Sequence, residues 1–252
     1  MCSVVIDYRP DAAWPVILAA NRDEMLARPW DPPGRHWPDR PNVVAGRDRL
    51  AGGSWLGLND EGVVAGILNR ADSLGPKPGF RSRGELVLEA LDHADAAAAA
   101  DALGSLDPRA YRSFNLVIAD NRDAFWLRHR GVEHGADRIE AIRLAPGLSM
   151  LTAHDLNDPA SGRIRGYLPR FQAAPRPDVA ATGDSGWSAW EALLAGREGD
   201  GPYDAMAVVT EAGFGTVSSA LIALPAAGSG SKPIWRFAAG LPGPTPFVRV
   251  VL

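Results

Sequence analysis

The chain of 252 residues is poor in cysteine and in lysine. Its single cysteine, Cys2, excludes an internal disulfide framework and any metal site built from several cysteines. Only Lys77 and Lys232 are lysines, so arginine supplies nearly all of the positive charge. Together with many Ala, Gly and Pro residues, this bias is typical of GC-rich bacterial coding and says little about partners.

The chain also lacks any long uninterrupted apolar segment. The longest uncharged run, residues 212–231, is broken by Gly, Ser and Pro and is too discontinuous for a bilayer helix. Near the start, Asp7 and Arg9 interrupt any apolar core of a secretion signal. The net charge of −4 argues against a general nucleic-acid-binding protein. We therefore expect a cytoplasmic protein with no membrane span and no nucleic-acid partner.

What remains is an ordinary globular composition, with 46% hydrophobic and 22% charged residues. Apolar runs predict strands over 3–8, 15–20, 43–46, 54–58, 63–68, 114–119, 125–127, 206–210, 217–224, 233–237 and 247–251. A Ser82-x-x-Glu85 capping box predicts one long helix to about residue 103, and two weaker helices are predicted over 161–171 and 187–195. The proline-rich segment 28–38 predicts coil. We expect one α+β domain over residues 1–252, with helices covering a pair of packed sheets.

Cys2 is the first candidate for chemistry, because removal of Met1 would make it the N-terminal residue. A thiol and a free α-amine would then share one residue, and an α-amine with a pKa of roughly 7.7–8.0 accepts a proton near neutral pH. An N-terminal amine that activates its own side-chain nucleophile is a known catalytic arrangement. The alternative is a small, inert residue at the start of an edge strand.

The tetrapeptide Asn21-Arg22-Asp23-Glu24 is predicted to end the second strand, and hairpin pairing would bring it close to the Cys2 thiol. Asp23 could orient the α-amine, while Arg22 could lower the pKa of the thiol or bind a substrate carboxylate. The alternative is a polar turn. The same tripeptide also occurs as Asn121-Arg122-Asp123 in a predicted hairpin turn, to which we assign no role.

Asn69 is a third candidate, because it directly follows the apolar run 63–68. An amide at the end of a buried strand is suited to donate a hydrogen bond to a developing oxyanion, and loss of such a donor typically costs on the order of a hundredfold in rate. A polar strand terminus is the alternative interpretation.

Three further residues are candidates for substrate binding. Trp30 and Trp37 lie in the proline-rich segment and could line the mouth of an apolar pocket, with surface coil as the alternative. His154 could face a pocket or a loop surface. The five histidines lack the spacing of a helical metal site, so no metal is expected.

Short motifs are spread in order between residue 2 and about residue 224: Cys2, Leu18-Ala19-Ala20-Asn21-Arg22-Asp23-Glu24, Arg28-Pro29, Gly52-Gly53-Ser54-Trp55-Leu56-Gly57, Ser82-Arg83-Gly84-Glu85-Leu86, Phe114-Asn115-Leu116 and Gly215-Thr216-Val217-Ser218-Ser219. Together they resemble the NRDE family, also called the transport-and-Golgi-organization family. That family is similar to N-terminal-nucleophile hydrolases, which implies a four-layer αββα sandwich of two largely antiparallel sheets. Its closest catalytic relatives would be the choloylglycine hydrolase and penicillin V acylase group, which cleaves amides with an N-terminal cysteine.

The resemblance implies roles for individual residues. Cys2 matches the nucleophile, Asn21 and Asp23 match a supporting Asn-x-Asp segment, and Asn69 matches the asparagine of the oxyanion hole.

Three positions depart from the pattern of these relatives. Ala20 stands where the acylase group has an arginine, which leaves Arg22 as a stand-in. The region 151–155 lacks an expected second asparagine and carries His154 instead. Val217 occupies a position where many NRDE relatives have a basic residue.

We therefore predict an N-terminal-cysteine hydrolase-like protein acting on an amide or thioester bond of an acylated small molecule, with no cofactor required. Its catalytic residues would be Cys2, Asn21, Arg22, Asp23 and Asn69. The alternative is a non-catalytic protein that binds or carries haem or an acyl lipid in the same cavity, and the departures at positions 20 and 153 favour it.

Overall fold

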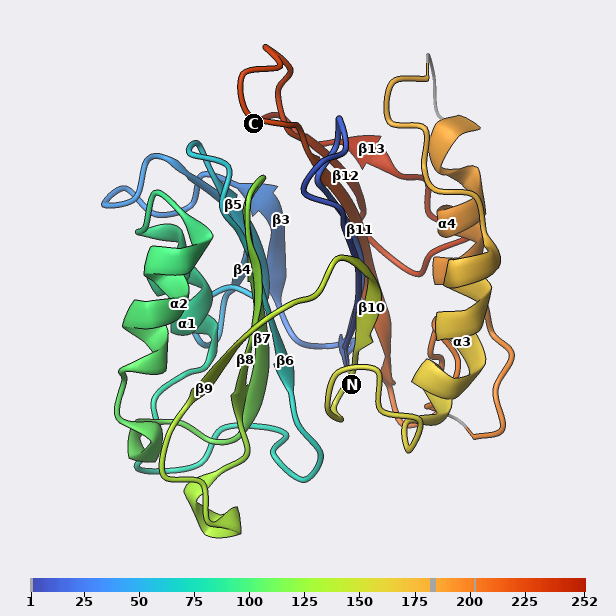
Figure 1. Ribbon diagram of the computed structural model, residues 1–252. Helices are drawn as coiled ribbons and strands as arrows, with labels where there is room; N and C mark the ends of the chain where they lie inside the picture. Colours follow the sequence, from blue (N-terminus) through green and yellow to red (C-terminus); the bar gives the residue numbers. More distant parts are fainter. Residues whose placement is uncertain (1, 182–184, 202) are drawn as a thin grey trace. The chain divides into compact units, whose positions relative to one another are not determined.

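The computed structural model describes residues 2–181, 185–201 and 203–252, and it divides into two compact units (Figure 1). Unit 1 comprises the chain up to Arg28 together with Pro146–Val250. Unit 2 comprises Pro29–Ala145 with Val251 and Leu252. Each unit has its own antiparallel sheet and its own pair of α-helices, which confirms the predicted α+β class. A single domain over residues 1–252 stays a prediction.

The sheet of unit 1 holds the candidate nucleophile. Its strands, within the described residues, follow the order β10-β1-β2-β11-β12-β13, and each neighbouring pair is antiparallel. In the β1–β2 hairpin Ser3 pairs with Asn21, and β2 pairs in turn with the long strand β11. The bounds are β1 (Ser3–Tyr8), β2 (Val16–Met25), β10 (Gly147–Leu151), β11 (Phe214–Leu224), β12 (Ile234–Ala238) and β13 (Val248–Arg249).

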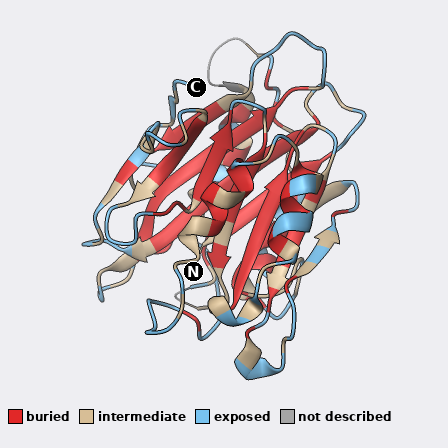
Figure 2. Ribbon diagram, turned by 90° about the vertical axis from the view of Figure 1, so that its left-hand side faces the viewer, coloured by how far each residue is buried: buried red, intermediate tan, exposed pale blue. Residues whose placement is uncertain are grey.

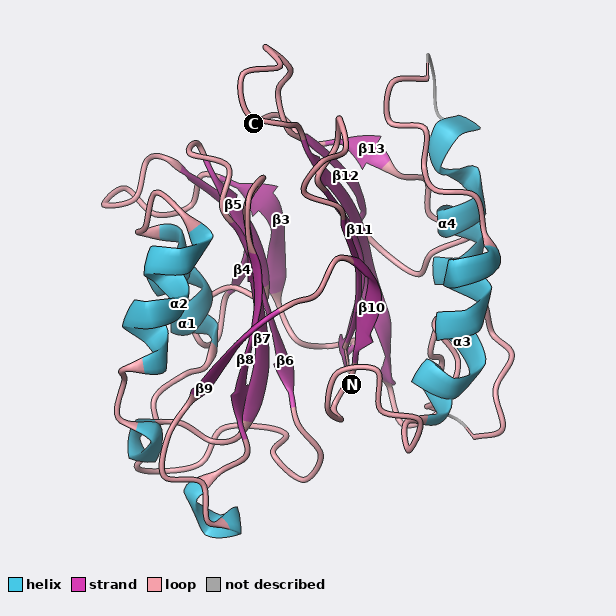
Figure 3. Ribbon diagram, in the orientation of Figure 1, coloured by secondary structure: helices cyan, strands magenta, loops and turns pink. Residues whose placement is uncertain are grey.

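The helices α3 (Gly162–Ala173) and α4 (Ser188–Leu194) pack on one face of this sheet (Figure 3). α3 begins where the sequence predicts, because Ser161 is its N-cap and accepts a hydrogen bond from the backbone N of Ile164. A short 3-10 turn, Ser185–Trp187, precedes α4. Phe171 of α3 and Trp190 of α4 share one core with strand residues, among them Val5, Ile17, Ala19, Met150, Leu221 and Ala223.

The sheet of unit 2 follows the strand order β3-β4-β5-β6-β7-β8-β9 within the described residues. The strands are β3 (Trp30–Gly34), β4 (Val43–Asp48), β5 (Leu56–Asn59), β6 (Val64–Asn69), β7 (Phe114–Ala119), β8 (Ala124–His129) and β9 (Glu140–Arg143). The helical segments are α1 (Gly84–Leu91), α2 (Ala96–Gly104) and the 3-10 turns Pro108–Ala110 and Val132–His134.

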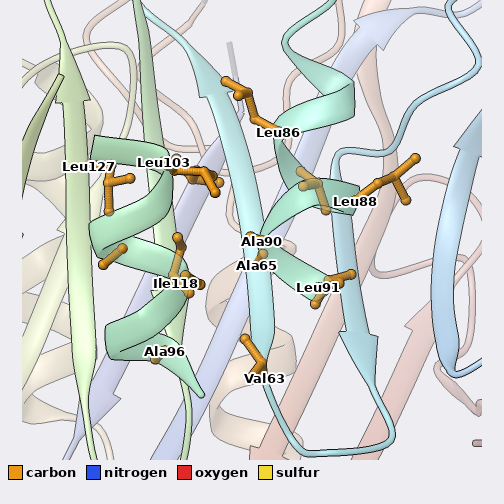
Figure 4. Close-up of a cluster of buried hydrophobic side chains, with 14 of the residues drawn as sticks. Val63, Ala65, Leu86, Leu88, Ala90, Leu91, Ala96, Leu103, Ile118 and Leu127 are labelled. Carbon is orange, nitrogen blue, oxygen red and sulfur yellow. The ribbon is translucent and has the colours of Figure 1, made fainter. Parts of the chain in front are cut away.

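α1 and α2 cover one face of the unit 2 sheet and form its apolar core. Figure 4 shows side chains from both helices and from β6, β7 and β8 meeting in one cluster. Leu86, Ala90 and Leu91 are among its fully buried members. The strands are mostly buried while the loops are mostly exposed (Figure 2), as the apolar runs of the sequence predict.

The single long helix predicted from residue 82 to about 103 is wrong, because the chain forms two helices there. Asp95 interrupts the alanine-rich segment and caps α2, since its side chain accepts a hydrogen bond from the backbone N of Ala98.

The predicted capping box of Ser82 and Glu85 also fails to form. The Ser82 hydroxyl accepts a hydrogen bond from the backbone N of Gly84, while Glu85 pairs with Arg81.

Three strand predictions are also corrected. The tetrapeptide Asn21–Glu24 does not end the second strand but lies inside β2, where β11 pairs with it on one side. Part of the proline-rich segment is the edge strand β3 rather than coil, and an edge strand tolerates proline because one side of it needs no partner. Residues 206–210 form only a single bridge, between Val209 and Gly215.

Candidate functional site

Cys2 lies directly before β1, beside the tetrapeptide of β2. Because Ser3 pairs with Asn21, the antiparallel register places Cys2 opposite Arg22. The thiol donates a long hydrogen bond to the backbone carbonyl of Asp23, with an Sγ···O distance of 3.8 Å. Cys2 is half-buried. The hairpin thus brings the only thiol of the chain into contact with the polar segment of β2.

The surroundings of Cys2 favour its protonated thiol over the thiolate. Burial raises the pKa of the Cys2 thiol above its usual value of 9.0, and the negative charge of Asp23 acts in the same direction. The positive charges of the chain's N-terminus and of Arg22 lower the pKa, but burial dominates. A nucleophilic Cys2 therefore needs a base close to its sulfur.

The carboxylate of Asp23 is held by two partners on the helix-covered face of the sheet. Its Oδ2 accepts a hydrogen bond from Arg163 Nη1 of α3 at 2.8 Å, and its Oδ1 accepts one from Thr216 Oγ1 of β11 at 2.6 Å. The Arg163 and Asp23 side chains are 3% and 0% exposed. The contact between Asp23 and the thiol is therefore made by the backbone of Asp23, while its side chain forms a buried ion pair.

Asn21 lies on the same face as Asp23, because the two residues are two positions apart in one strand. Its Nδ2 donates to the carbonyls of Leu194 and Met206, both at 2.9 Å. Its Oδ1 accepts a hydrogen bond from Ser219 Oγ at 2.7 Å. The amide thus ties β2 to α4, to the segment before β11 and to β11 itself.

Arg22 points to the opposite face from Asn21 and Asp23, since side chains alternate along a strand. It is 5% exposed and stands between Cys2 on one side and Ser218 on the other. Its guanidinium is close enough to lower the pKa of the Cys2 thiol.

The positions that depart from the family pattern lie in unit 1. Ala20, opposite Val4 in the hairpin, is 9% exposed, and Ala153 is 2% exposed. Val217 lies at the irregularity in the pairing of β11 with β2. His154 is half-buried in the loop after β10, and its backbone N donates to Thr152 Oγ1 at 3.4 Å.

The remaining predicted site residues belong to unit 2. Asn69 ends β6 and pairs with Phe114 of β7, whose ring lies in the core under α1 and α2. Trp30 begins β3, and its ring meets that of Trp55 edge to face at 5.7 Å. Trp37 donates from Nε1 to a backbone carbonyl and packs against the core. The roles assigned to these three residues stay predictions.

The sequence interpretation missed Arg163, Thr216 and Ser219. Thr216 and Ser219 lie in one of the quoted motifs, and their hydroxyls are the partners of Asp23 and Asn21. Arg163 had a weaker signal. It precedes Tyr167 and Phe171 by four and eight residues, so a charged side chain stands in the apolar stripe of α3, where all three are buried.

The described residues hold neither a cluster of three His, Cys, Asp or Glu side chains arranged for a metal ion nor a helix long and apolar enough to cross a membrane.

Comparison with solved structures supports the fold prediction. The Caenorhabditis elegans ortholog of N-acylethanolamine-hydrolyzing acid amidase matches with a TM-score of 0.58 and 12% identity, over 88% of this chain and 92% of that chain. A variant of the conjugated bile acid hydrolase of Clostridium perfringens matches with a TM-score of 0.53 and 12% identity, over 98% and 92%. Penicillin V acylase from Agrobacterium tumefaciens matches with a TM-score of 0.53 and 14% identity, over 99% and 86%. At these identities the likeness shows the fold alone, which is that of the N-terminal-nucleophile hydrolases.

Comparison with protein sequences gives the family. The Transport and Golgi organization 2 homologs of Mus musculus and Homo sapiens are each 32% identical to this chain, over 127 and 134 residues. Each match covers 48% of this chain and 45% of the relative, so the matched region spans less than half of either protein. The model of the family described as Transport and Golgi organisation 2 matches residues 1–171. Since this match covers more than half of the chain, the chain belongs to the Transport and Golgi organisation 2 family.

Proposed function

We propose that this chain is an N-terminal-cysteine hydrolase that cleaves an amide or thioester bond in an acylated small molecule. The observation that carries the proposal is the position of Cys2 directly before β1. There its thiol contacts the backbone carbonyl of Asp23, and the residue lies opposite the buried Arg22. Solved structures with a similar fold include proteins named as an amidase and an acylase, which supports acyl transfer as the reaction class.

The reaction begins after Met1 is removed. The α-amine of Cys2 takes the thiol proton, and the sulfur attacks the acyl carbonyl carbon to form a C–S bond. The C–N or C–S bond to the leaving group then breaks, and the ammonium returns the proton to the departing amine or thiol. Water hydrolyses the acyl-cysteine and restores the thiol. Because burial raises the pKa of the Cys2 thiol, the step depends on this adjacent amine.

The other residues assist this chemistry. Arg22 provides positive charge beside the sulfur, and Asp23 contributes the backbone group that contacts the thiol. Asn21 holds β2 in place beneath the site. Asn69 as the oxyanion donor rests on the family resemblance.

A non-catalytic carrier of haem or an acyl lipid is the second candidate. Ala20 is a buried methyl group where the acylase pattern has an arginine, and the region 151–155, which includes the buried Ala153, lacks the expected asparagine. Fewer groups would therefore stabilise the charge of an acyl-transfer transition state. Cys2 and His154 are side chains of types that bind haem iron in other proteins. Trp30 and Trp37 remain proposed contacts for an apolar ligand in either case.

Turnover of a panel of N-acyl amides and acyl thioesters separates the two candidates. We expect the wild type to release amine or thiol, and we expect Cys2→Ala to reduce release to the uncatalysed rate. Retained turnover in Cys2→Ala would remove the thiol from the mechanism. In parallel, haem is titrated into the wild type, Cys2→Ala and His154→Ala. A Soret shift that depends on either residue, in a protein without turnover, would favour the carrier.

A further inference from the structure

We propose that Arg163 is a positioning residue for the Cys2 thiol: it holds the Asp23 side chain on the helix-covered face and compensates its negative charge. The inference deepens the proposed function, because it concerns the same thiol. It is independent of turnover, however, since it makes a statement about thiol ionisation alone.

The geometry of Asp23 is the first argument. One carboxylate oxygen accepts a hydrogen bond from Arg163 Nη1 at 2.8 Å and the other accepts one from Thr216 Oγ1 at 2.6 Å. With both oxygens occupied, the side chain is fixed in direction. The backbone carbonyl of the same residue, which β2 pairs with Thr216 of β11, accepts the thiol hydrogen bond at 3.8 Å.

Arg163 is itself held in place at the first turn of α3. The N-cap residue Ser161 is linked to the end of β10, because Thr152 Oγ1 donates to Ser161 Oγ at 3.1 Å. Gly162 lies so close to the Asp204 carboxylate that an added Cβ would overlap with it. The helix therefore presents Arg163 to β2 from a constrained N-terminus.

The second argument is electrostatic. Among the charged groups of the described residues, Asp23 raises the pKa of the Cys2 thiol and Arg22 lowers it, and the positive charge at the chain's N-terminus also lowers it. The Asp23 carboxylate is 0% exposed, so water screens its charge little and the guanidinium of Arg163 is its charged partner. A second carboxylate, that of Asp204, lies beside Gly162 at the start of α3. Loss of the Arg163 charge would leave the full field of Asp23 on the sulfur.

The test is the pH dependence of Cys2 alkylation by iodoacetamide, followed by intact mass. Because the chain has one cysteine, the part of the mass increase that is missing in Cys2→Ala reports on the Cys2 thiol alone. We expect Arg163→Met to raise the pH midpoint of alkylation by about one unit, since an uncompensated nearby charge shifts a pKa by this order. We expect Arg163→Lys, which keeps the charge, to have a midpoint close to that of the wild type. Circular dichroism verifies that each variant is folded.

Asp23→Asn is the second variant, and it decides the question if Arg163→Met does not fold. Without the carboxylate charge, the midpoint should fall by about one unit. An unchanged midpoint in folded Arg163→Met, or in Asp23→Asn, would overturn the proposal and leave the pair with a role in stability only. If the midpoints shift as expected while no substrate is turned over, the inference stands and the hydrolase proposal fails.

Discussion

Replacement of Asn21 by Ala should destabilise the protein strongly, although the side chain is small. Its amide makes three hydrogen bonds, to the carbonyls of Leu194 and Met206 and to the hydroxyl of Ser219. Each bond contributes about 1 kcal/mol net to the free energy of unfolding. All three partners are at most 1% exposed and would be left without this amide, which adds to the cost. We expect a total loss of about 3–5 kcal/mol.

Urea unfolding followed by tryptophan fluorescence measures this loss. The second copy of the tripeptide offers a matched control, because Asn121 lies half-exposed in the turn between β7 and β8. Asn121→Ala should change the free energy of unfolding by less than about 0.5 kcal/mol. If Asn21→Ala lowered the free energy of unfolding as little as Asn121→Ala, with the same slope against urea concentration, the Asn21 amide would not be linking β2 to α4 and β11.

Two further predictions concern unit 2. Gly53→Ala should destabilise the unit by about 1–3 kcal/mol in urea unfolding, because the new Cβ would overlap with the backbone of Gly84 at the start of α1. A Gly53→Ala variant as stable as the wild type would contradict this close approach. Hydrogen bonds from Arg49 and Arg47 lower the pKa of Asp31 from 3.8 to about 2. The stabilisation that the Asp31 carboxylate gains from these two arginines is therefore present above pH 3.8 and is lost as the pH falls towards 2. The urea midpoints of wild type and Asp31→Asn should accordingly differ at pH 7 and converge near pH 2. A difference that persists at pH 2 would show another cause.

Much of the fold follows from local patterns. Apolar runs locate β1, β6 and β7 within one residue of their observed bounds, and Ser161 marks the start of α3. The errors arise where tertiary contacts outweigh local signals. Asn21–Glu24 is polar enough for a turn, yet β2 continues through it because the buried side chains find partners on α3, α4 and β11.

Only part of the candidate site could be predicted from the sequence. Hairpin pairing places Cys2 beside β2, and the sequence pattern suffices to predict that. The partners of the β2 side chains come from positions about 140 to 200 residues away, such as Arg163 and Ser219. No local pattern specifies which distant side chain meets Asp23, so the buried ion pair becomes visible only in the folded chain.

The central claim is that Cys2 becomes an N-terminal nucleophile, and the intact mass of the protein after exposure to an activated acyl ester tests it most directly. The account predicts a mass without Met1, plus one acyl group that is absent in Cys2→Ala and disappears slowly as water hydrolyses it. A protein that retains Met1, or that gains the same acyl mass in Cys2→Ala, would contradict it.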